Sequence, residues 1–351
     1  MTALGGVMLC TGTAASHPGS ALDKVLAAYD QDEHRDLRGV VVLHEGKVIA
    51  ERYYNGETAD TLHDIRSAGK SVTGLLVGIA IDQRKMHDPD DKVSTYWPEA
   101  KNSAIGDVAI KDVLTMRSGL AAFDADPASP GNEDKLDAAP DPIAFLLSAP
   151  RADPPGSRYR YNSLTAYAAG VVVAKATGSS MADFAQTALF EPLGFRHWKW
   201  ASDAAAYTKG QGNLSLTARD CAAIGEMVRG QGLYEGRRIV SANWIRRAVA
   251  PLVGISDSDP YAEGYGYFWY SKTSRSTARW FRSPLHRAMA AIRSMWFQVA
   301  AWSSRSHPVL MARGTASNAQ KRFYGLFLPS SSKTELPFMS NSLLPNLADR
   351  F

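Results

Sequence analysis

The stretch RSAGKSVTGLLVGIAID, residues 66–82, places a serine and a lysine three positions apart at the head of an apolar segment. Its apolar residues recur at helical spacing over residues 71–82, which predicts a helix. Glycines at 69, 74 and 78 lower the helix propensity, so they indicate close packing against neighbouring elements. We therefore expect this helix at the centre of the fold.

The serine and lysine of this stretch, Ser67 and Lys70, allow two interpretations. A serine at a helix N-terminus lies near the positive end of the helix, and a lysine three residues later lies on the same face. If burial favours the neutral amine, Lys70 can take the proton of Ser67 and make it a nucleophile. Alternatively, Ser67 is an ordinary N-cap and Lys70 lies on a solvated face. The motif alone does not decide, since residues 330–333 (SSSK) repeat it by chance.

A tyrosine in PPGSRYRYNS, residues 154–163, supports the catalytic interpretation. Tyr161 follows a Pro-Gly turn and is followed by Asn162 and Ser163. A tyrosine beside the lysine can act as general base on Ser67 and then as acid toward the leaving group. The alternative is a core tyrosine whose hydroxyl is satisfied by a structural hydrogen bond.

The remaining patterns predict strands, then many helices, then a strand again. GVVVLHEGKVIAERYYNG (residues 39–56) alternates around a glycine turn and predicts a β-hairpin, whereas residues 263–270 (EGYGYFWY) predict a returning strand. Helices are expected at residues 110–120, 141–150, 162–178 and 215–230, the last with Ser215 or Thr217 as its cap, and a long loop up to about residue 140. The first and last strands must then meet across the helical block.

Several of these motifs, in this order, resemble the serine β-lactamase and penicillin-binding-protein superfamily, in its class C-like branch with related serine esterases and D-amino-acid peptidases. They are RSAGKSVTGLLVGIAID, IKDVLTMRSGL, PPGSRYRYNSLTAYAAGVVVAKATG, EPLGF and GYGYFWY. The resemblance implies an α/β (α+β) fold, β-lactamase/transpeptidase-like, with an antiparallel sheet flanked by helices plus an all-helical region. It also implies Ser67 as the acylated nucleophile, Lys70 as its proton acceptor, Tyr161 as the second base and Ser163 as a substrate-binding residue where many members have Asn.

The sequence divides into three predicted parts. Residues 1–20 are apolar and end in small residues like a clipped signal peptide, although a frayed N-terminus is the alternative. A signal peptide predicts a periplasmic or secreted protein, and without one the protein would be cytoplasmic. Residues 21–273 form the hydrolase domain, and residues 274–351 an atypical basic tail with eleven Lys or Arg against two acidic residues.

The tail departs from the family pattern. The family's Lys-Thr-Gly, His-x-Gly or Gly-rich segment, which supplies one oxyanion amide, is not found after Tyr270. Reading the codons of residues 288–314 from the third base of each can spell NGGNPQHVVPGRGLVVAVTSRPYG, with a Gly-Gly turn and a valine-rich strand. We hypothesise a frameshifted C-terminus that leaves the central sheet without two edge strands. The alternative is a basic extension that binds an anionic partner.

The function expected is a serine hydrolase that forms an acyl-enzyme on Ser67 with a small-molecule or peptide-like ester, amide or β-lactam. The alternative is an impaired or inactive relic, or a binding protein, because the third motif is missing. No metal-ligand spacing, Gly-rich phosphate loop or Gly-x-Ser-x-Gly motif occurs, so no metal and no cofactor are expected. Irregularly spaced arginines argue against nucleic acid, and short apolar runs against an integral membrane segment. The oligomeric state stays open.

Overall fold

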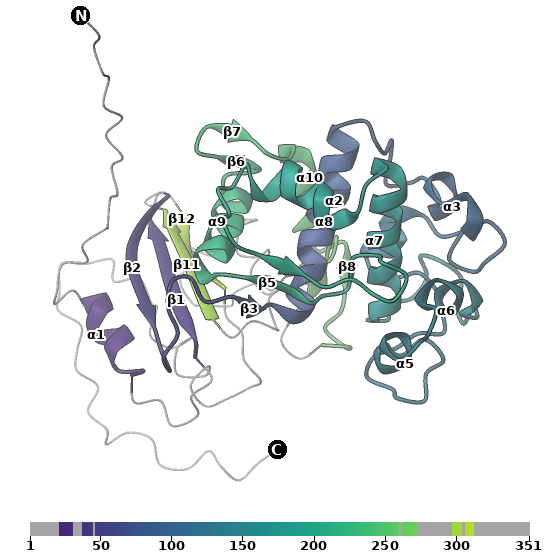
Figure 1. Ribbon diagram of the computed structural model, residues 1–351, viewed down its shortest axis with the longest axis horizontal. Helices are drawn as coiled ribbons and strands as arrows, with labels where there is room; N and C mark the ends of the chain where they lie inside the picture. Colours follow the sequence, from purple (N-terminus) through teal and green to yellow (C-terminus); the bar gives the residue numbers. More distant parts are fainter. Residues whose placement is uncertain are drawn as a thin grey trace, which may run out of the picture. The chain divides into compact units, whose positions relative to one another are not determined.

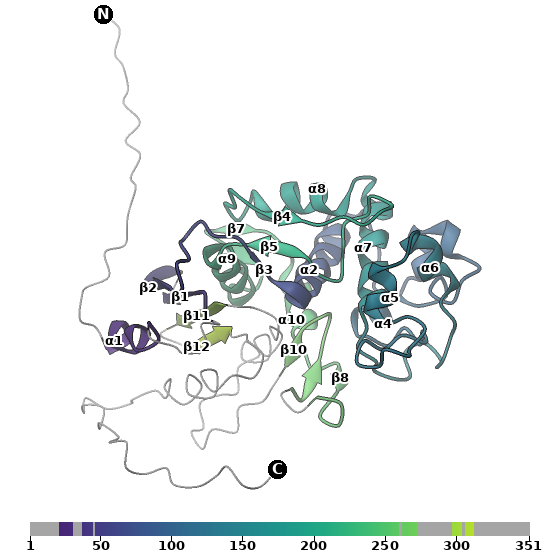
Figure 2. The same ribbon diagram turned by 60° about the horizontal axis from the view of Figure 1, so that its bottom comes forward.

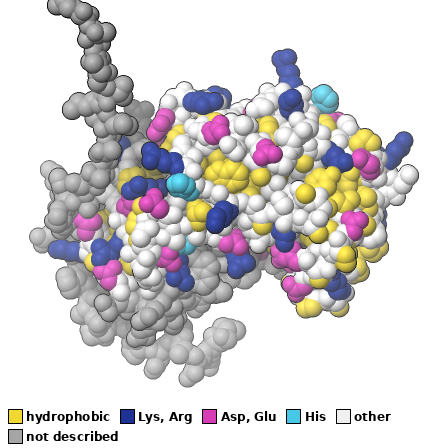
Figure 3. All heavy atoms as spheres, viewed as in Figure 1, with side chains coloured by type: hydrophobic (Ala, Val, Ile, Leu, Met, Phe, Trp, Pro, Cys, Tyr) yellow, Lys and Arg dark blue, Asp and Glu magenta, His cyan; other side chains and the backbone are white. Residues whose placement is uncertain are grey.

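The computed structural model describes residues 21–30, 37–44, 46–259, 262–271, 297–303 and 306–311. The chain divides into two units, Met1–Thr315 and Ala316–Phe351, and every described residue lies in the first. Among the described helices, none combines the length and the apolar character that crossing a membrane requires. Acidic and basic side chains are interspersed over the face of the described part that Figure 3 shows.

The main sheet has the order β12-β11-β1-β2 (Figure 1). Strands β1 (Gly39–His44) and β2 (Lys47–Tyr53) form the predicted antiparallel hairpin, and Gly46 between them has φ +78°. That left-handed conformation favours glycine because a Cβ atom would be strained there. Helix α9 (Ala218–Arg229) packs against β1 and β11, and α1 (Ala21–Ala27) packs against β2.

Two strands of this sheet come from the region that sequence analysis assigned to the tail. Strand β11 (Phe297–Ser303) pairs with β1 in parallel, and β12 (Ser306–Met311) pairs with β11 antiparallel. The expectation that the sheet lacks two edge strands is therefore wrong, because the backbone of residues 297–303 pairs with the edge of β1 and residues 306–311 pair with β11 in turn. The boundary at residue 274 and the frameshift itself stay predictions.

Helix α2 (Gly69–Asp82) lies in the core, as expected, and packs against α7 (Ser163–Thr177) (Figures 1 and 2). Every residue of α2 from Gly69 to Ala80 is buried. A Cβ atom on Gly78 would lie 2.2 Å from the Trp244 ring, and one on Gly74 would lie 2.8 Å from the Tyr267 carbonyl oxygen. The prediction that these glycines permit close packing is confirmed.

Shorter helices and strands surround this pair. The helices are α3 (Val93–Tyr96), α4 (Ile110–Leu114), α5 (Glu133–Asp137), α6 (Pro142–Ser148), α8 (Met181–Ala185), α10 (Ala242–Ala248), the 3-10 turns η1 (Arg66–Ala68) and η2 (Pro98–Ala100), and the π-helical turn η3 (Gln186–Phe190). Three small sheets consist of β3 (His63–Asp64), β5 (Leu214–Leu216) and β4 (Lys199–Trp200); β6 (Leu233–Tyr234) and β7 (Arg237–Arg238); and β8 (Val253–Gly254), β9 (Gly264–Tyr265) and β10 (Tyr270–Ser271).

Three local predictions needed correction. The helix expected at residues 110–120 ends at Leu114, and the expected long loop contains α5. The cap of α9 is Thr217, in a capping box with Asp220, because Ser215 belongs to β5. The strand expected at residues 263–270 is split into β9 and β10 of a small separate sheet (Figure 2). It splits because Phe268 has φ +61° and the chain reverses over residues 266–269.

Candidate active site

Ser67 lies in the η1 turn that leads from β3 into α2. The residue before it, Arg66, has φ +51°, and its N–H donates to Asp64 Oδ1 at 2.8 Å. The N-cap of α2 is Ala68, and no side chain caps the helix. The interpretation of Ser67 as an ordinary N-cap is therefore wrong, and its hydroxyl is available for other contacts.

Lys70 is buried one helical turn further on, with only 1% of its surface exposed. Its Nζ donates to Ser67 Oγ at 3.0 Å, to Ser163 Oγ at 3.1 Å and to the Gln211 carbonyl oxygen at 2.8 Å. An ammonium group has three N–H donors, so these acceptors account for all of them. The alternative that placed Lys70 on a solvated face is wrong.

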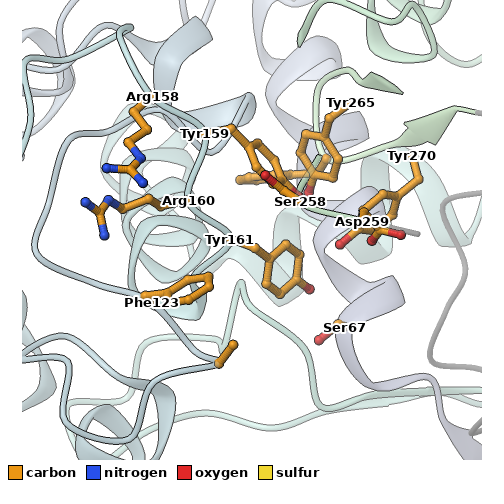
Figure 4. A pocket seen from close by; sticks show the side chains of 12 residues that line it. Ser67, Phe123, Arg158, Tyr159, Arg160, Tyr161, Ser258, Asp259, Tyr265 and Tyr270 are labelled. Atoms are coloured by element: carbon orange, nitrogen blue, oxygen red, sulfur yellow. The ribbon is translucent and has the colours of Figure 1, made fainter. Parts of the chain in front are cut away.

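The structure brings Tyr161 to the same place. The Lys70 Nζ lies 5.0 Å from the centroid of the Tyr161 ring, which stacks on Tyr270 with centroids 6.2 Å apart. Figure 4 shows the phenol end of Tyr161 directed to the side of the cavity where Ser67 lies. Within the described residues, the Tyr161 hydroxyl forms no hydrogen bond with Ser67 or Lys70. Ser67, Lys70 and Tyr161 therefore lie close together, but no continuous chain of hydrogen bonds joins all three.

Ser163 lies behind Ser67 and Tyr161, at the start of α7. It is the first residue of α7 and is completely buried, and Asn162 before it caps the helix by accepting from the Thr165 N–H at 2.7 Å. Its hydroxyl accepts a hydrogen bond from the Lys70 amine. Ser163 is not among the residues that line the cavity. Its role as a substrate contact stays a prediction, whereas its contact with Lys70 is a feature of the structure.

A cavity of about 490 Å³ opens over Ser67 (Figure 4). Half of the residues that line it are aromatic: Phe123, Tyr159, Tyr161, Tyr265, Phe268 and Tyr270. Polar groups interrupt this wall at Arg158, Arg160, Ser258 and Asp259. Asp259 is 5% exposed, and Arg160 forms an ion pair with Asp153 at 2.8 Å. The cavity therefore suits a substrate with an apolar body and polar groups at its ends.

Sequence reasoning missed two groups next to Lys70. The Gln211 carbonyl is a backbone acceptor, so no side-chain pattern could have marked it. Asp124 has both carboxylate oxygens buried, and burial raises its pKa, while the Ser163 N–H and the charge of Lys70 act in the opposite direction. Asp124 lies in FDADPASPGNEDKLD, residues 123–137, where three other aspartates obscured it.

Among the described residues, no group of three or more His, Cys, Asp or Glu side chains is placed to hold a metal ion. That the reaction needs neither metal nor cofactor stays a prediction. His63 in β3, the strand before the turn that holds Ser67, is buried, and burial lowers its pKa.

Comparisons with known proteins show the family to which the chain belongs. The family profile described as Beta-lactamase matches residues 22–298. The chain is 28% identical over 221 residues to a 6-aminohexanoate-dimer hydrolase of Paenarthrobacter ureafaciens, covering 60% of this chain and 56% of that protein. It is 27% identical over 142 residues to a β-lactamase of Escherichia coli (strain K12), covering 40% of this chain and 35% of that protein. The chain thus spans about half or less of these curated relatives.

Solved structures share the fold at lower sequence identity. A putative 6-aminohexanoate-dimer hydrolase from Bacillus anthracis has a TM-score of 0.61 at 19% identity, covering 87% of this chain and 80% of that one. A class C β-lactamase from Rhodobacter sphaeroides has a TM-score of 0.53 at 18% identity, covering 72% and 76%. The fold predicted from the sequence motifs is confirmed.

Proposed function

Because the chain belongs to the Beta-lactamase family, we propose that it is a serine hydrolase whose acyl-enzyme forms on Ser67. The observation that carries the proposal is the 3.0 Å contact between Lys70 Nζ and Ser67 Oγ, with the amine buried beside the Tyr161 ring. A serine hydroxyl is a weak nucleophile until an adjacent base takes its proton. Lys70, in its neutral form, is placed to do so.

The proposed reaction has two stages. In the first, Lys70 takes the Ser67 proton, Ser67 Oγ attacks the acyl carbon, and the leaving group departs with a proton that Tyr161 is placed to deliver. In the second, water attacks the acyl carbon and gives a proton to Tyr161, the bond to Ser67 Oγ breaks, and Lys70 returns the proton that restores the Ser67 hydroxyl as the acid product leaves. The Ser67 N–H at the start of α2 is one donor for the developing oxyanion, since free N–H groups and the positive helix end lie there.

Esters, amides and β-lactams are all acyl donors to a serine, so the proposal covers the three classes. The first class to test is a linear amide, because the match to 6-aminohexanoate-dimer hydrolase extends further along the chain than the match to β-lactamases. The aromatic wall of the cavity supports an extended apolar acyl group. A panel of one linear amide, one nitrophenyl ester and one chromogenic β-lactam ranks them by kcat/KM.

Covalent labelling tests the acyl-enzyme. A fluorophosphonate should add one probe mass to the protein at Ser67. Ser67→Ala should abolish this adduct, because the other hydroxyl that contacts Lys70 among the described residues, that of Ser163, is completely buried and does not line the cavity. The matched control is Ser157→Ala, an exposed serine in the loop before α7, which should label like the wild type. Peptide mass spectrometry locates the adduct. Equal labelling of folded Ser67→Ala protein would contradict the proposal.

A second function is supported by the sequence after Tyr270, where the family's segment for a second oxyanion donor is not found. Loss of one such donor lowers kcat by roughly a hundredfold or more. A protein that retains the cavity without turnover would raise its melting temperature with substrate analogues yet form no adduct with the fluorophosphonate. The labelling and melting experiments together separate the two functions.

A further inference from the structure

We propose that Arg158 binds a carboxylate of the substrate, and that the preferred acyl donor therefore carries a carboxylate at the end of an apolar arm. The inference deepens the proposed function and rests on acylation of Ser67. Arg158 takes no part in the proposed proton transfers. Its role is to select among substrates by their charge.

Two arginines lie on one side of the cavity. Arg158 and Arg160 both line it, and Figure 4 shows their guanidinium groups on the left of the view, with Ser67 and Asp259 on the right. Among the described residues that line the cavity, the one acidic side chain is Asp259. An anionic group of the substrate is therefore attracted to the side of the arginines and repelled from the side of Asp259.

The two arginines differ in whether a carboxylate of the protein already compensates their charge. Arg160 Nε donates to Asp153 Oδ2 at 2.8 Å, and this ion pair is partly buried. Arg158 is exposed, and in the part of the chain that the structure describes its guanidinium forms no hydrogen bond and no ion pair. A guanidinium presents a planar set of N–H donors that fits a carboxylate through two parallel hydrogen bonds. Arg158 is therefore available to a carboxylate of the substrate.

The loop before α7 holds Arg158 at this side of the cavity. The Gly156 N–H donates to the Arg117 carbonyl oxygen at 2.8 Å. Two residues after Arg158, the Arg160 N–H donates to the Met116 carbonyl oxygen at 2.8 Å. The backbone on both sides of Arg158 is thus fixed before substrate binds, so binding has to order only its side chain, which lowers the entropic cost.

An exposed aromatic ring lies on the same side of the cavity as the arginines. Four large apolar side chains are exposed in the described part of the chain, and the one that lines the cavity is Phe123, which is 37% exposed. In Figure 4 the Tyr161 ring lies between the arginines and Ser67. A substrate arm that extends from Ser67 toward Arg158 would contact these rings, and burial of their apolar surface favours binding. The arm that fits is apolar along its length and anionic at its end.

Two matched pairs of substrates test the inference. One pair has the carboxylate on the acyl group: the mono-para-nitrophenyl ester of adipic acid and the methyl ester of that compound. The other pair has it on the leaving group: meta-acetoxybenzoate and its methyl ester. For each pair we measure the ratio of kcat/KM for the carboxylate to kcat/KM for the neutral ester. In Arg158→Gln this ratio should fall about tenfold in at least one pair, the low end for a hydrogen bond to a charged group.

Arg196→Gln is the matched control. Arg196 is exposed and does not line the cavity, so this variant removes the same charge from the protein without touching the site. Its ratios should equal those of the wild type. An equal fall in Arg196→Gln and Arg158→Gln would show that net charge attracts the anion, and it would overturn the proposal. Arg158→Glu should lower the affected ratio further, because a carboxylate at this position repels the substrate.

The outcomes separate this inference from the proposed function. Unchanged ratios in Arg158→Gln for both pairs, with the esters still hydrolysed through Ser67, would overturn the role of Arg158 and leave the serine hydrolase intact. If the wild-type protein forms no fluorophosphonate adduct at Ser67, the proposed function fails, and the role of Arg158 fails with it. Since Arg158 has no side-chain contact to lose among the described residues, its variants should melt at the temperature of the wild type.

Discussion

Lys70 is a lysine in the protein core, where charged residues are rarely found. Its aliphatic stem is buried in α2, and its amine reaches oxygens from η1, from α7 and from the segment that carries Gln211. Those acceptors make burial tolerable, because an unpaired buried amine would cost several kcal/mol. They also fix the direction in which the amine meets Ser67.

The hydroxyl of Tyr161 should matter for the reaction and little for the fold. Tyr161→Phe keeps the ring that contacts Lys70 and Tyr270, so we expect an unchanged melting temperature. Loss of the acid–base group should lower kcat/KM about 10²- to 10⁴-fold. Steady-state kinetics on the best substrate of the panel measure it. Tyr159→Phe, on the same cavity wall, is the control, and equal effects of both variants would remove Tyr161 from the proposed mechanism.

Among the elements, α2 shows best how sequence determines position. Its glycines form no catalytic contact, but they allow the Trp244 ring and the 266–269 reversal to approach the helix backbone. The Trp244 indole N–H donates to the Gly74 carbonyl oxygen at 3.0 Å. The start of α2, and with it Ser67, is thereby fixed relative to the cavity wall that includes Phe268.

Gly78→Ala should reveal this packing. Alanine favours a helix over glycine by about 1 kcal/mol, yet its Cβ would lie 2.2 Å from the Trp244 ring. Overpacking of this kind costs about 1–3 kcal/mol, so the variant should be less stable in urea denaturation. Gly254→Ala in β8 meets nothing within 4 Å and should change stability by less than about 0.5 kcal/mol. If both variants match the wild type, the close approach does not determine the position of α2.

The elements also show where sequence prediction succeeds. Apolar residues predicted the hairpin and helices α2 and α7, because these elements lie in the core, where α2 is buried from Gly69 to Ala80 and α7 from Ser163 to Val173. Local rules failed where tertiary contacts decide, as at Phe268, whose left-handed backbone divides a segment of strand-like composition. The site was predictable as a set of side chains, Ser67, Lys70 and Tyr161. The Gln211 carbonyl and Asp124 were not, because a backbone acceptor and one aspartate among several carry no signal.

For the whole molecule, the main sheet has an uncommon connection. Strands β1 and β11 are parallel neighbours, and the entire helical region lies between them in sequence. Parallel strands need a crossover, and here that crossover contains every residue around Lys70. The helical region that holds the site therefore enters the main sheet at one end through β1 and at the other through β11. Strand β11 belongs to residues 274–351, the segment for which we hypothesise a frameshift. The location of the protein in the periplasm or outside the cell stays a prediction.

Nucleotide sequence tests the frameshift hypothesis. We expect the gene, read across the codons for residues 270–293, to show a one-base change relative to a frame that encodes the Gly-Gly turn and the valine-rich strand. A chain expressed in the restored frame should then acylate Ser67 roughly a hundredfold faster or more, since it regains an oxyanion donor. An intact frame in a gene whose relatives encode the same basic tail would exclude the hypothesis.

The acceptors of the Lys70 amine, at positions 67, 163 and 211, also have a kinetic consequence. Contacts between residues so distant in the chain form late in folding. The chain loses the entropy of closing the long loops between them before these contacts can stabilise it. During refolding, secondary structure should thus recover before reactivity toward the probe. A newly made chain would stay chemically inert until its architecture is complete, which protects both the nascent protein and its neighbours from premature acyl transfer.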